Sequence, residues 1–312
     1  MRRLGLYIGL DRPSKTGTPR AVAITAPSPG VATALGAVTV SGTFAGTGAG
    51  AVTQVAVYFG ARLLGTATLG SGTWSYSWVP WSNDLGAKAL TAVASGASGA
   101  PITSAGVNMT VTAPSYLWGW YDPSVSTYVT LSGGNVTALA DITGNSRPIA
   151  SAGGGLFAQG TGANQVNALN TLVGAKVASQ YFGPAGTGPQ EGYAVAKFAG
   201  GLPFPSYCGL MTQSGLLWVE GNSGSSALFS GFGTTYVDNA ATSAVTAGAH
   251  VFGWSYGSNV STTEFTIGNQ RNFLTGGDWI GPIGEIVLAN RVLNSGERGA
   301  VNSYLKSKWG TP

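Results

Sequence analysis

The C-terminal segment, residues 279–310, constrains the fold of this chain more than any other part of the sequence. Within residues 283–290, the large apolar side chains of Ile286 and Leu288 fall on one side, and Glu285 falls on the other. This alternation is the pattern of a strand with one buried and one exposed face. The sequence therefore predicts a half-buried strand shortly before the final residues.

A single well-capped helix is predicted after this strand. Asn294 and Glu297 have the spacing of a capping box, in which each side chain accepts a hydrogen bond from a free backbone amide. Helical spacing then relates Val301, Tyr304, Leu305 and Lys308. We expect Lys306 and Lys308 to complement the negative end of the helix dipole, and Gly310 to end the helix.

The rest of the sequence favours strands and tight turns. The 312 residues include 50 glycines and 15 prolines, and only 8% are charged, as expected for short strands joined by many turns. A hydrophobic content of 44%, with 9 Trp, 12 Tyr and 11 Phe, is enough to bury a large core. We therefore predict an all-β protein with one C-terminal helix, long enough for two domains.

Residues 21–112 contain several segments with the alternation of strands. In residues 73–79, Trp74, Tyr76 and Trp78 share one face, so one side of this strand should pack and the other should face water. About seven short strands over this length are typical of an immunoglobulin-like sandwich. The pattern formed by Val55, Val57, Phe59, Gly60, residues 64–68 and residues 72–78 resembles bacterial immunoglobulin-like repeats, which implies a spacer role.

Residues 114–312 carry a second resemblance. Residues 120–124 (WYDPS) and 140–146 (ADITGNS) look like the opening strand and turn of a concanavalin A-like (laminin-G-like) jelly-roll domain. The end of that domain is matched at Gly281, Ile283, Glu285, Ile286, Asn290, Arg291, Leu293, Glu297, Arg298, Tyr304, Leu305, Lys308, Trp309 and Gly310. The resemblance implies a two-sheet sandwich with a binding role, often toward carbohydrate.

Charge and linkers complete the predicted organisation. Residues 1–20 hold five of the basic side chains and form a predicted N-terminal docking arm, followed by a spacer domain at 21–113 and the jelly-roll domain at 114–312. The remaining sequence has ten basic and ten acidic groups, so we expect the arm to contact other proteins and not nucleic acid. We expect neither a membrane span nor a secretory signal.

The residues available for chemistry are few. The single histidine, His250, should lie beside Phe252 and Trp254 on one strand face, as a structural or surface imidazole. Residues 253–257 match the G-x-S-x-G nucleophile pattern, but no histidine follows them and no strand–helix alternation surrounds them. The lone Cys208 should be a small buried side chain. We therefore predict that the protein is not an enzyme.

The sequence permits a calcium site. The chain has too few cysteines and histidines for structural zinc, whereas calcium needs only oxygen ligands. The candidate ligands are Asp122, Asp141 and Asn145. Alternatively, residues 141–145 form a hydrogen-bonded turn in which the Asp and Asn side chains cap backbone amides.

Ligand contacts are predicted among aromatic and polar side chains at the edge of the second sandwich. Aromatic rings stack on sugars and amides bind hydroxyls, so the candidates are Trp118, Trp120, Tyr121, Asn269, Arg271 and Trp279. Core packing is the competing role for each aromatic residue. Glu220 and Glu264 are the acidic residues that a glycosidase could direct into a groove.

These observations predict a non-enzymatic virion structural protein, assembled in the host cytoplasm and exposed on the particle as a head fibre, decoration protein or tail fibre. The arm would dock on other virion proteins, the first domain would act as a spacer, and the second would attach to a host-surface glycan. A symmetric homo-oligomer is expected. The alternatives are a polysaccharide-degrading hydrolase and a purely structural capsid cement without a ligand.

Overall fold

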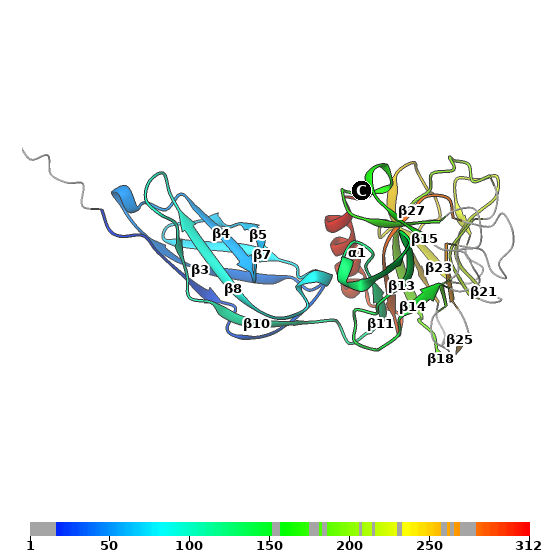
Figure 1. The fold of residues 1–312 in the computed structure, drawn as a ribbon, viewed down its shortest axis with the longest axis horizontal. Helices are drawn as coiled ribbons and strands as arrows, with labels where there is room; N and C mark the ends of the chain where they lie inside the picture. Colours follow the sequence, from blue (N-terminus) through cyan, green and yellow to red (C-terminus); the bar gives the residue numbers. More distant parts are fainter. Residues whose placement is uncertain are drawn as a thin grey trace, which may run out of the picture. The chain divides into compact units, whose positions relative to one another are not determined.

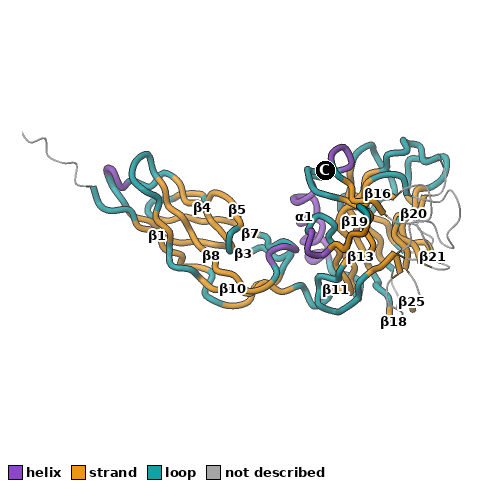
Figure 2. Tube along the Cα trace, in the orientation of Figure 1, coloured by secondary structure: helices purple, strands orange, loops and turns teal. Residues whose placement is uncertain are grey.

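The computed structural model confirms an all-β fold with one C-terminal helix (Figure 1). It describes residues 17–151, 157–174, 181–182, 186–205, 208–213, 216–229, 233–256, 261–262, 265–268 and 279–312. The chain divides into two compact units, Met1–Pro80 with Asp84–Thr112, and Trp81–Asn83 with Ala113–Pro312. Strands make up most of the regular structure of each unit (Figure 2).

The first unit is an immunoglobulin-like sandwich of two sheets. One sheet has the order β1 (Ala21–Ala26), β3 (Val38–Ala45), β7 (Thr73–Trp78) and β6 (Thr68–Leu69). The other has the order β2 (Gly30–Thr33), β10 (Val107–Thr112), β8 (Gly86–Ser95), β4 (Gln54–Phe59) and β5 (Arg62–Thr66), and β9 (Ile102–Thr103) pairs with β8. A 3-10 turn lies at Gly48–Gly50 (η1), and a second one, Ser82–Asp84 (η2), begins in the segment Trp81–Asn83 that belongs to the second unit.

The predicted alternation in residues 73–79 is confirmed. Trp74 and Trp78 are buried, Tyr76 is half-buried, and the two serines between them are exposed. The two sheets meet where the ring of Phe59 from β4 packs on Trp78 of β7, with ring centroids 4.7 Å apart. A core of this kind follows directly from period-2 strands whose apolar faces are brought together.

Arg20 belongs to this sandwich and not to a free arm. Its side chain is buried, and its guanidinium donates hydrogen bonds to the carbonyl oxygens of Ser98 and Ala100, each at 2.7 Å. This corrects the assignment of Arg20 to the predicted docking arm at 1–20. The other basic residues of that segment lie outside the described residues.

The second unit contains a large sheet, in which the pairings between described strands are antiparallel, and a smaller sheet. The large sheet has the order β17 (Tyr181–Phe182), β14 (Ile149–Ser151), β13 (Asn135–Leu139), β15 (Phe157–Gly160), β16 (Thr171–Gly174), β27 (Pro282–Ala289), β19 (Glu191–Lys197), β24 (Ala249–Ser255) and β23 (Thr234–Val237). In addition, β11 (Leu117–Tyr121) pairs with β27, and β12 (Val129–Ser132) pairs with β13. The smaller sheet is β22 (Leu228–Phe229), β21 (Leu216–Gly221), β20 (Cys208–Gln213) and β26 (Phe265–Ile267). A separate pair joins β18 (Gly186–Thr187) to β25 (Ser261–Thr262), and 3-10 turns lie at Ser126–Tyr128 (η3) and Gly162–Asn164 (η4).

One hydrophobic core joins the large and small sheets of this unit. Ile286 and Leu288 of β27 share it with Phe252 of β24 and with Leu210 and Met211 of β20. Because both sheets contribute to a single apolar cluster, the unit is a sandwich. The finer assignment to the concanavalin A-like class stays a prediction.

The expectation that β27 is half-buried was wrong, because all eight of its residues are buried. The face opposite Ile286 and Leu288 is covered by α1 (Ser295–Trp309). Gly284 permits the close approach, since an added Cβ atom would lie 3.0 Å from the ring of Trp309. Glu285 is thereby placed in a buried environment where the sequence pattern predicted solvent.

The predicted helix and its caps are confirmed. The Asn294 side chain accepts a hydrogen bond from the Glu297 amide at 2.9 Å, and the Glu297 carboxylate accepts one from the Asn294 amide at 3.1 Å. Gly310 ends the helix in the left-handed conformation, with φ of 63°. Lys306 and Lys308 lie in the last turn as expected, and Lys308 is in addition buried and paired with carboxylates.

Candidate functional site

Lys308 of α1 lies between two buried carboxylates. Its Nζ atom is 2.7 Å from Oε2 of Glu285 on β27 and also donates a hydrogen bond to Oδ2 of Asp122, directly after β11. The side chains of Asp122 and Glu285 are 0% exposed, and that of Lys308 is 3% exposed. We call these three residues the buried lysine cluster.

Aromatic donors surround the Glu285 carboxylate. Trp120 Nε1 and the Tyr304 hydroxyl donate to Oε1, the latter at 2.6 Å, and Trp309 Nε1 donates to Oε2 at 2.9 Å. The rings also exclude water, and burial raises the pKa of Glu285 above its usual value. The carboxyl is therefore held by directed hydrogen bonds within an apolar shell.

Asp122 is also held by several donors. Its Oδ1 accepts hydrogen bonds from the backbone amide of Ser124 at 3.0 Å and from the hydroxyl of the same residue at 2.6 Å, while Ser82 donates to Oδ2.

Burial by itself would lower the pKa of Lys308, but the charges of Glu285 and Asp122 outweigh it and raise that pKa above its usual value. The resting cluster thus holds an ammonium between two acids.

Another buried acid lies where β19 meets the start of α1. Glu191 is fully buried and accepts two hydrogen bonds from the Arg298 guanidinium, each at 3.0 Å, and one from the Leu293 amide at 3.0 Å. The Tyr193 hydroxyl donates to the same carboxylate, and the guanidinium lies over the ring of Tyr236, 4.7 Å from its centroid. This arrangement fixes the loop before α1.

Of the two predicted roles of His250, a structural or a surface imidazole, its burial in β24 fits the structural one. Its ring lies 5.8 Å from the ring of Phe252, and Nδ1 is 2.6 Å from Oδ2 of Asp238. Nε2 is 3.1 Å from the carbonyl oxygen of Thr246. Both ring nitrogens face acceptors, and the hydrogen bond to Asp238 raises the pKa of His250.

The G-x-S-x-G pattern does not form a nucleophile elbow in the described part of the chain. Gly253, Trp254 and Ser255 belong to β24, and Tyr256 follows it. The strand continues the sheet by pairing with β19, so Ser255 lies opposite Glu191 in the register.

Cys208, in β20, is buried as predicted.

The predicted calcium ligands have separate roles in the structure. Oδ1 of Asp141 accepts hydrogen bonds from the Thr143 amide and hydroxyl, at 3.0 and 2.7 Å, and Oδ2 accepts from the Arg147 amide at 3.2 Å. Asn145 donates through Nδ2 to the carbonyl oxygen of Leu117 at 3.0 Å. Asp141 therefore caps backbone amides as in the alternative interpretation, whereas the Asn145 side chain donates to a carbonyl oxygen, and Asp122 pairs with Lys308. Within the described ranges, no cluster of three or more His, Cys, Asp or Glu side chains suits a metal.

Four of the predicted ligand contacts are core residues. Trp118 is 3% exposed, Trp279 is 1% exposed, and Trp120 and Tyr121 are 0% exposed. These four side chains pack against protein, so they belong to the core and are not free to contact a ligand. Asn269, Arg271 and Glu264 lie outside the described residues, as does the side chain of Glu220 in β21.

The buried lysine cluster and the Glu191 pair were missed by the sequence patterns. Glu285 and Glu191 sit in segments that read as strands, GEIVLA and EGYAVAK, where a charged residue normally marks the exposed face. Lys308 carried a signal of its own, because it falls on the same helical stripe as Val301, Tyr304 and Leu305. A charged residue on an apolar stripe predicts a buried partner.

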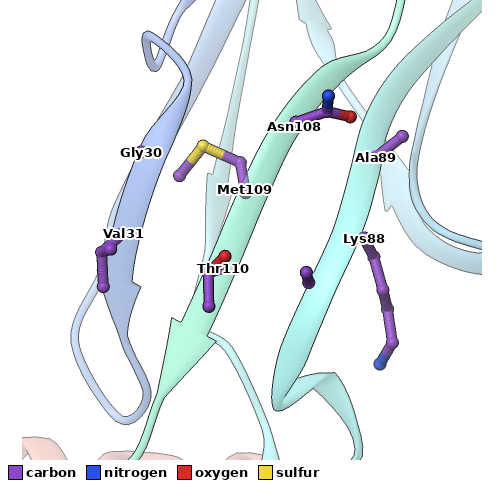
Figure 3. A pocket seen from close by; sticks show the side chains of 8 residues that line it. Gly30, Val31, Lys88, Ala89, Asn108, Met109 and Thr110 are labelled. Carbon is purple, nitrogen blue, oxygen red and sulfur yellow. The ribbon is translucent and has the colours of Figure 1, made fainter.

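The first unit has shallow depressions on its sheet surfaces. One of about 370 Å³ lies over β2, β10 and β8 and is lined by Val31, Lys88, Asn108 and Thr110 among others (Figure 3). Val31 is largely exposed there. Among the lining residues, none carries a carboxylate or an imidazole, so the depression has no acid–base pair for hydrolysis.

The family match to known proteins lies in the first unit. Residues 21–97 match the family described as bacterial Ig domain. No curated protein matches the chain. Fibronectin(III)-like modules of Clostridium thermocellum CbhA are similar at 24% identity, with 29% of this chain and 94% of that chain covered and a TM-score of 0.25. Trypanosoma rangeli sialidase is similar at 12% identity, with 94% of this chain and 54% of that chain covered and a TM-score of 0.36. Likenesses this low carry no functional conclusion.

No helix within the described ranges is long and apolar enough to cross a membrane.

The first unit is immunoglobulin-like by both its strand order and its family match. The second unit is a β-sandwich whose charged residues anchor one helix.

Proposed function

We propose that this chain is a non-enzymatic structural subunit of a virion surface, in which the immunoglobulin-like unit is a spacer and the second unit attaches to a host-surface glycan. The observation that carries the non-enzymatic part is the placement of the buried acids. Glu285, Asp122 and Glu191 are each saturated by protein donors and anchor α1. A glycosidase needs two carboxyl groups facing a cleft with room for the substrate.

The spacer role is supported by the architecture of the first unit. The match of residues 21–97 to bacterial Ig domains covers most of its strands. Two of its charged residues serve its own fold: Arg62 pairs with the buried Asp84, and Trp78 also donates to that carboxylate. A rigid two-sheet module with structural charge pairs suits separation of an anchor from a binding surface.

The attachment role must use side chains other than the four buried aromatics. Tyr116 and Tyr128 of the second unit are half-buried, and the Arg291 guanidinium lies over the Tyr116 ring, 5.4 Å from its centroid. Partly exposed tyrosines present a flat apolar face and a polar hydroxyl, which suits stacking on a sugar ring. They replace Trp118, Trp120, Tyr121 and Trp279 as the candidate contacts.

A purely structural cement is the second candidate, and the burial of those four aromatics favours it. A glycan array probed with the full chain, with and without calcium, separates the two. Binding that Tyr128→Ala or Tyr116→Ala weakens while the fold is retained would support attachment. Absence of binding across the array, with the chain folded, would leave the cement function. Shortened sugars recovered from the array or from a polysaccharide digest would overturn the non-enzymatic proposal.

A further inference from the structure

The buried lysine cluster brings together the three groups that form an amide without external reagents. A primary amine, Lys308 Nζ, contacts a carboxyl, Asp122, and a second carboxyl, Glu285 Oε2, lies 2.7 Å from the same nitrogen. All three are buried. They come from a strand, a helix and a post-strand loop far apart in the sequence, since Asp122 and Lys308 are 186 positions apart.

We propose that Lys308 and Asp122 join in an intramolecular isopeptide bond, with Glu285 as the proton carrier. This modification site lies beyond the attachment and spacer roles and does not depend on them.

The reaction balances without an oxidant, a cofactor or an activated donor. Glu285 takes a proton from the Lys308 ammonium, which frees the lone pair on Nζ to attack Cγ of Asp122. The new C–N bond forms, one C–O bond of the Asp122 carboxyl breaks, and the departing oxygen leaves as water after receiving protons through Glu285. An ammonium and a carboxylate are thereby converted into a neutral amide and one water, and Glu285 returns to its starting state.

Burial supplies the driving force. Two charges inside an apolar shell carry a large desolvation cost, and conversion to a neutral amide removes both. Trp120, Tyr304 and Trp309 form that shell around Glu285. Burial also raises the pKa of Glu285, which suits a group that must hold a proton during the reaction.

Pro123 excludes another route by which Asp122 could lose water. Water can also be lost from an aspartate by ring closure onto the following backbone amide, but residue 123 is a proline and has no N–H. Loss of one water that maps to Asp122 therefore identifies attack by another nitrogen. Lys308 is the amine in contact with that carboxyl.

Intact mass spectrometry of the purified full chain under denaturing conditions tests the proposal. We expect the wild-type chain to be lighter than its sequence mass by one water, and proteolysis to yield a branched peptide joining the Asp122 and Lys308 segments. Asp122→Asn should form the same amide with release of ammonia. Wild type and this variant would then converge on one mass, although their sequences differ in mass.

Two variants serve as controls. Lys308→Arg keeps the positive charge but lacks a nucleophilic amine, and should retain its full sequence mass. Glu285→Gln should slow the reaction, so that freshly purified protein is a mixture. If folded wild-type protein keeps its full mass and its Lys308 reacts with an amine reagent after unfolding, the cluster is an ion pair only and the proposal is overturned. This readout needs only the wild-type chain, so a variant that misfolds does not weaken it.

Discussion

Nζ of Lys308 lies 2.7 Å from Oε2 of Glu285, and through this contact α1 is joined to the middle of the large sheet. The contact links the helix to a strand that pairs on both sides, so its loss should affect the whole second unit. It also explains why a helix with charged residues near its end packs with that end buried.

Replacing Lys308 with Met should strongly destabilise the second unit. Whether Lys308 is an ammonium or is joined to Asp122, the substitution leaves Asp122 and Glu285 buried without their partner, and removing one partner of a buried pair costs about 3–5 kcal/mol. Denaturant unfolding of the full chain, fitted as separate transitions, measures the change. Lys306→Met on the same helix is the matched control, with an expected change within about 0.5 kcal/mol. Equal effects of the two variants would contradict the anchoring role.

Two arginine–glutamate pairs near the start of α1 should differ in their contribution to stability. Arg298 pairs with Glu191, with side-chain exposures of 18% and 0%, whereas Arg291 pairs with Glu297 at 47% and 23%. Arg298→Ala should cost about 3–5 kcal/mol because it leaves a buried carboxylate unpaired. Arg291→Ala should cost no more than about 1 kcal/mol. Thermal and denaturant unfolding of both variants provide the comparison, and a reversed order would refute the burial argument.

His250 should make stability depend on pH. The hydrogen bond with Asp238 raises the pKa of His250 in the folded state above the unfolded value of about 6.5. A raised pKa gives stability that is full below the unfolded pKa and is lost as pH rises through the folded one. The stability difference between wild type and His250→Gln should therefore shrink with increasing pH. Because the sequence has one histidine, its NMR titration is unambiguous, and a value at or below the unfolded one would disprove the prediction.

The capping box at the start of α1 should contribute measurably. Asn294→Ala removes the acceptor for the Glu297 amide and should cost about 1 kcal/mol. Asn294→Asp is the control, since aspartate caps about as well as asparagine and should change stability by a few tenths of a kcal/mol at most. Urea midpoints of the three proteins test this, and an alanine variant as stable as wild type would argue against the cap.

Features with a local cause could be predicted from the sequence. The capping box depends on two residues three positions apart, and the burial of Trp74 and Trp78 depends on strand alternation alone. Both are present as expected. The immunoglobulin-like unit followed from several such local patterns in succession.

The roles that failed depend on partners distant in sequence. Glu285 was expected on an exposed face because alternation does not reveal that α1 covers that face. A tryptophan that packs in a core and one that stacks on a sugar look the same in the sequence. Trp120 and Trp279 are core residues because the surrounding strands cover them. Asp122 and Lys308 are 186 positions apart in the sequence, so no local pattern predicts their pairing.

The position of β27 sets the order in which the second unit can be built. This strand pairs with β16, β19 and β11, so the middle of the sheet comes from residues translated after all three of these neighbours. Until those residues leave the ribosome, β19 and β11 each lack a neighbour and expose backbone groups that can pair with other chains. A product that stops before Pro282 would therefore be prone to aggregate, and nascent chains would need protection until synthesis has passed this strand.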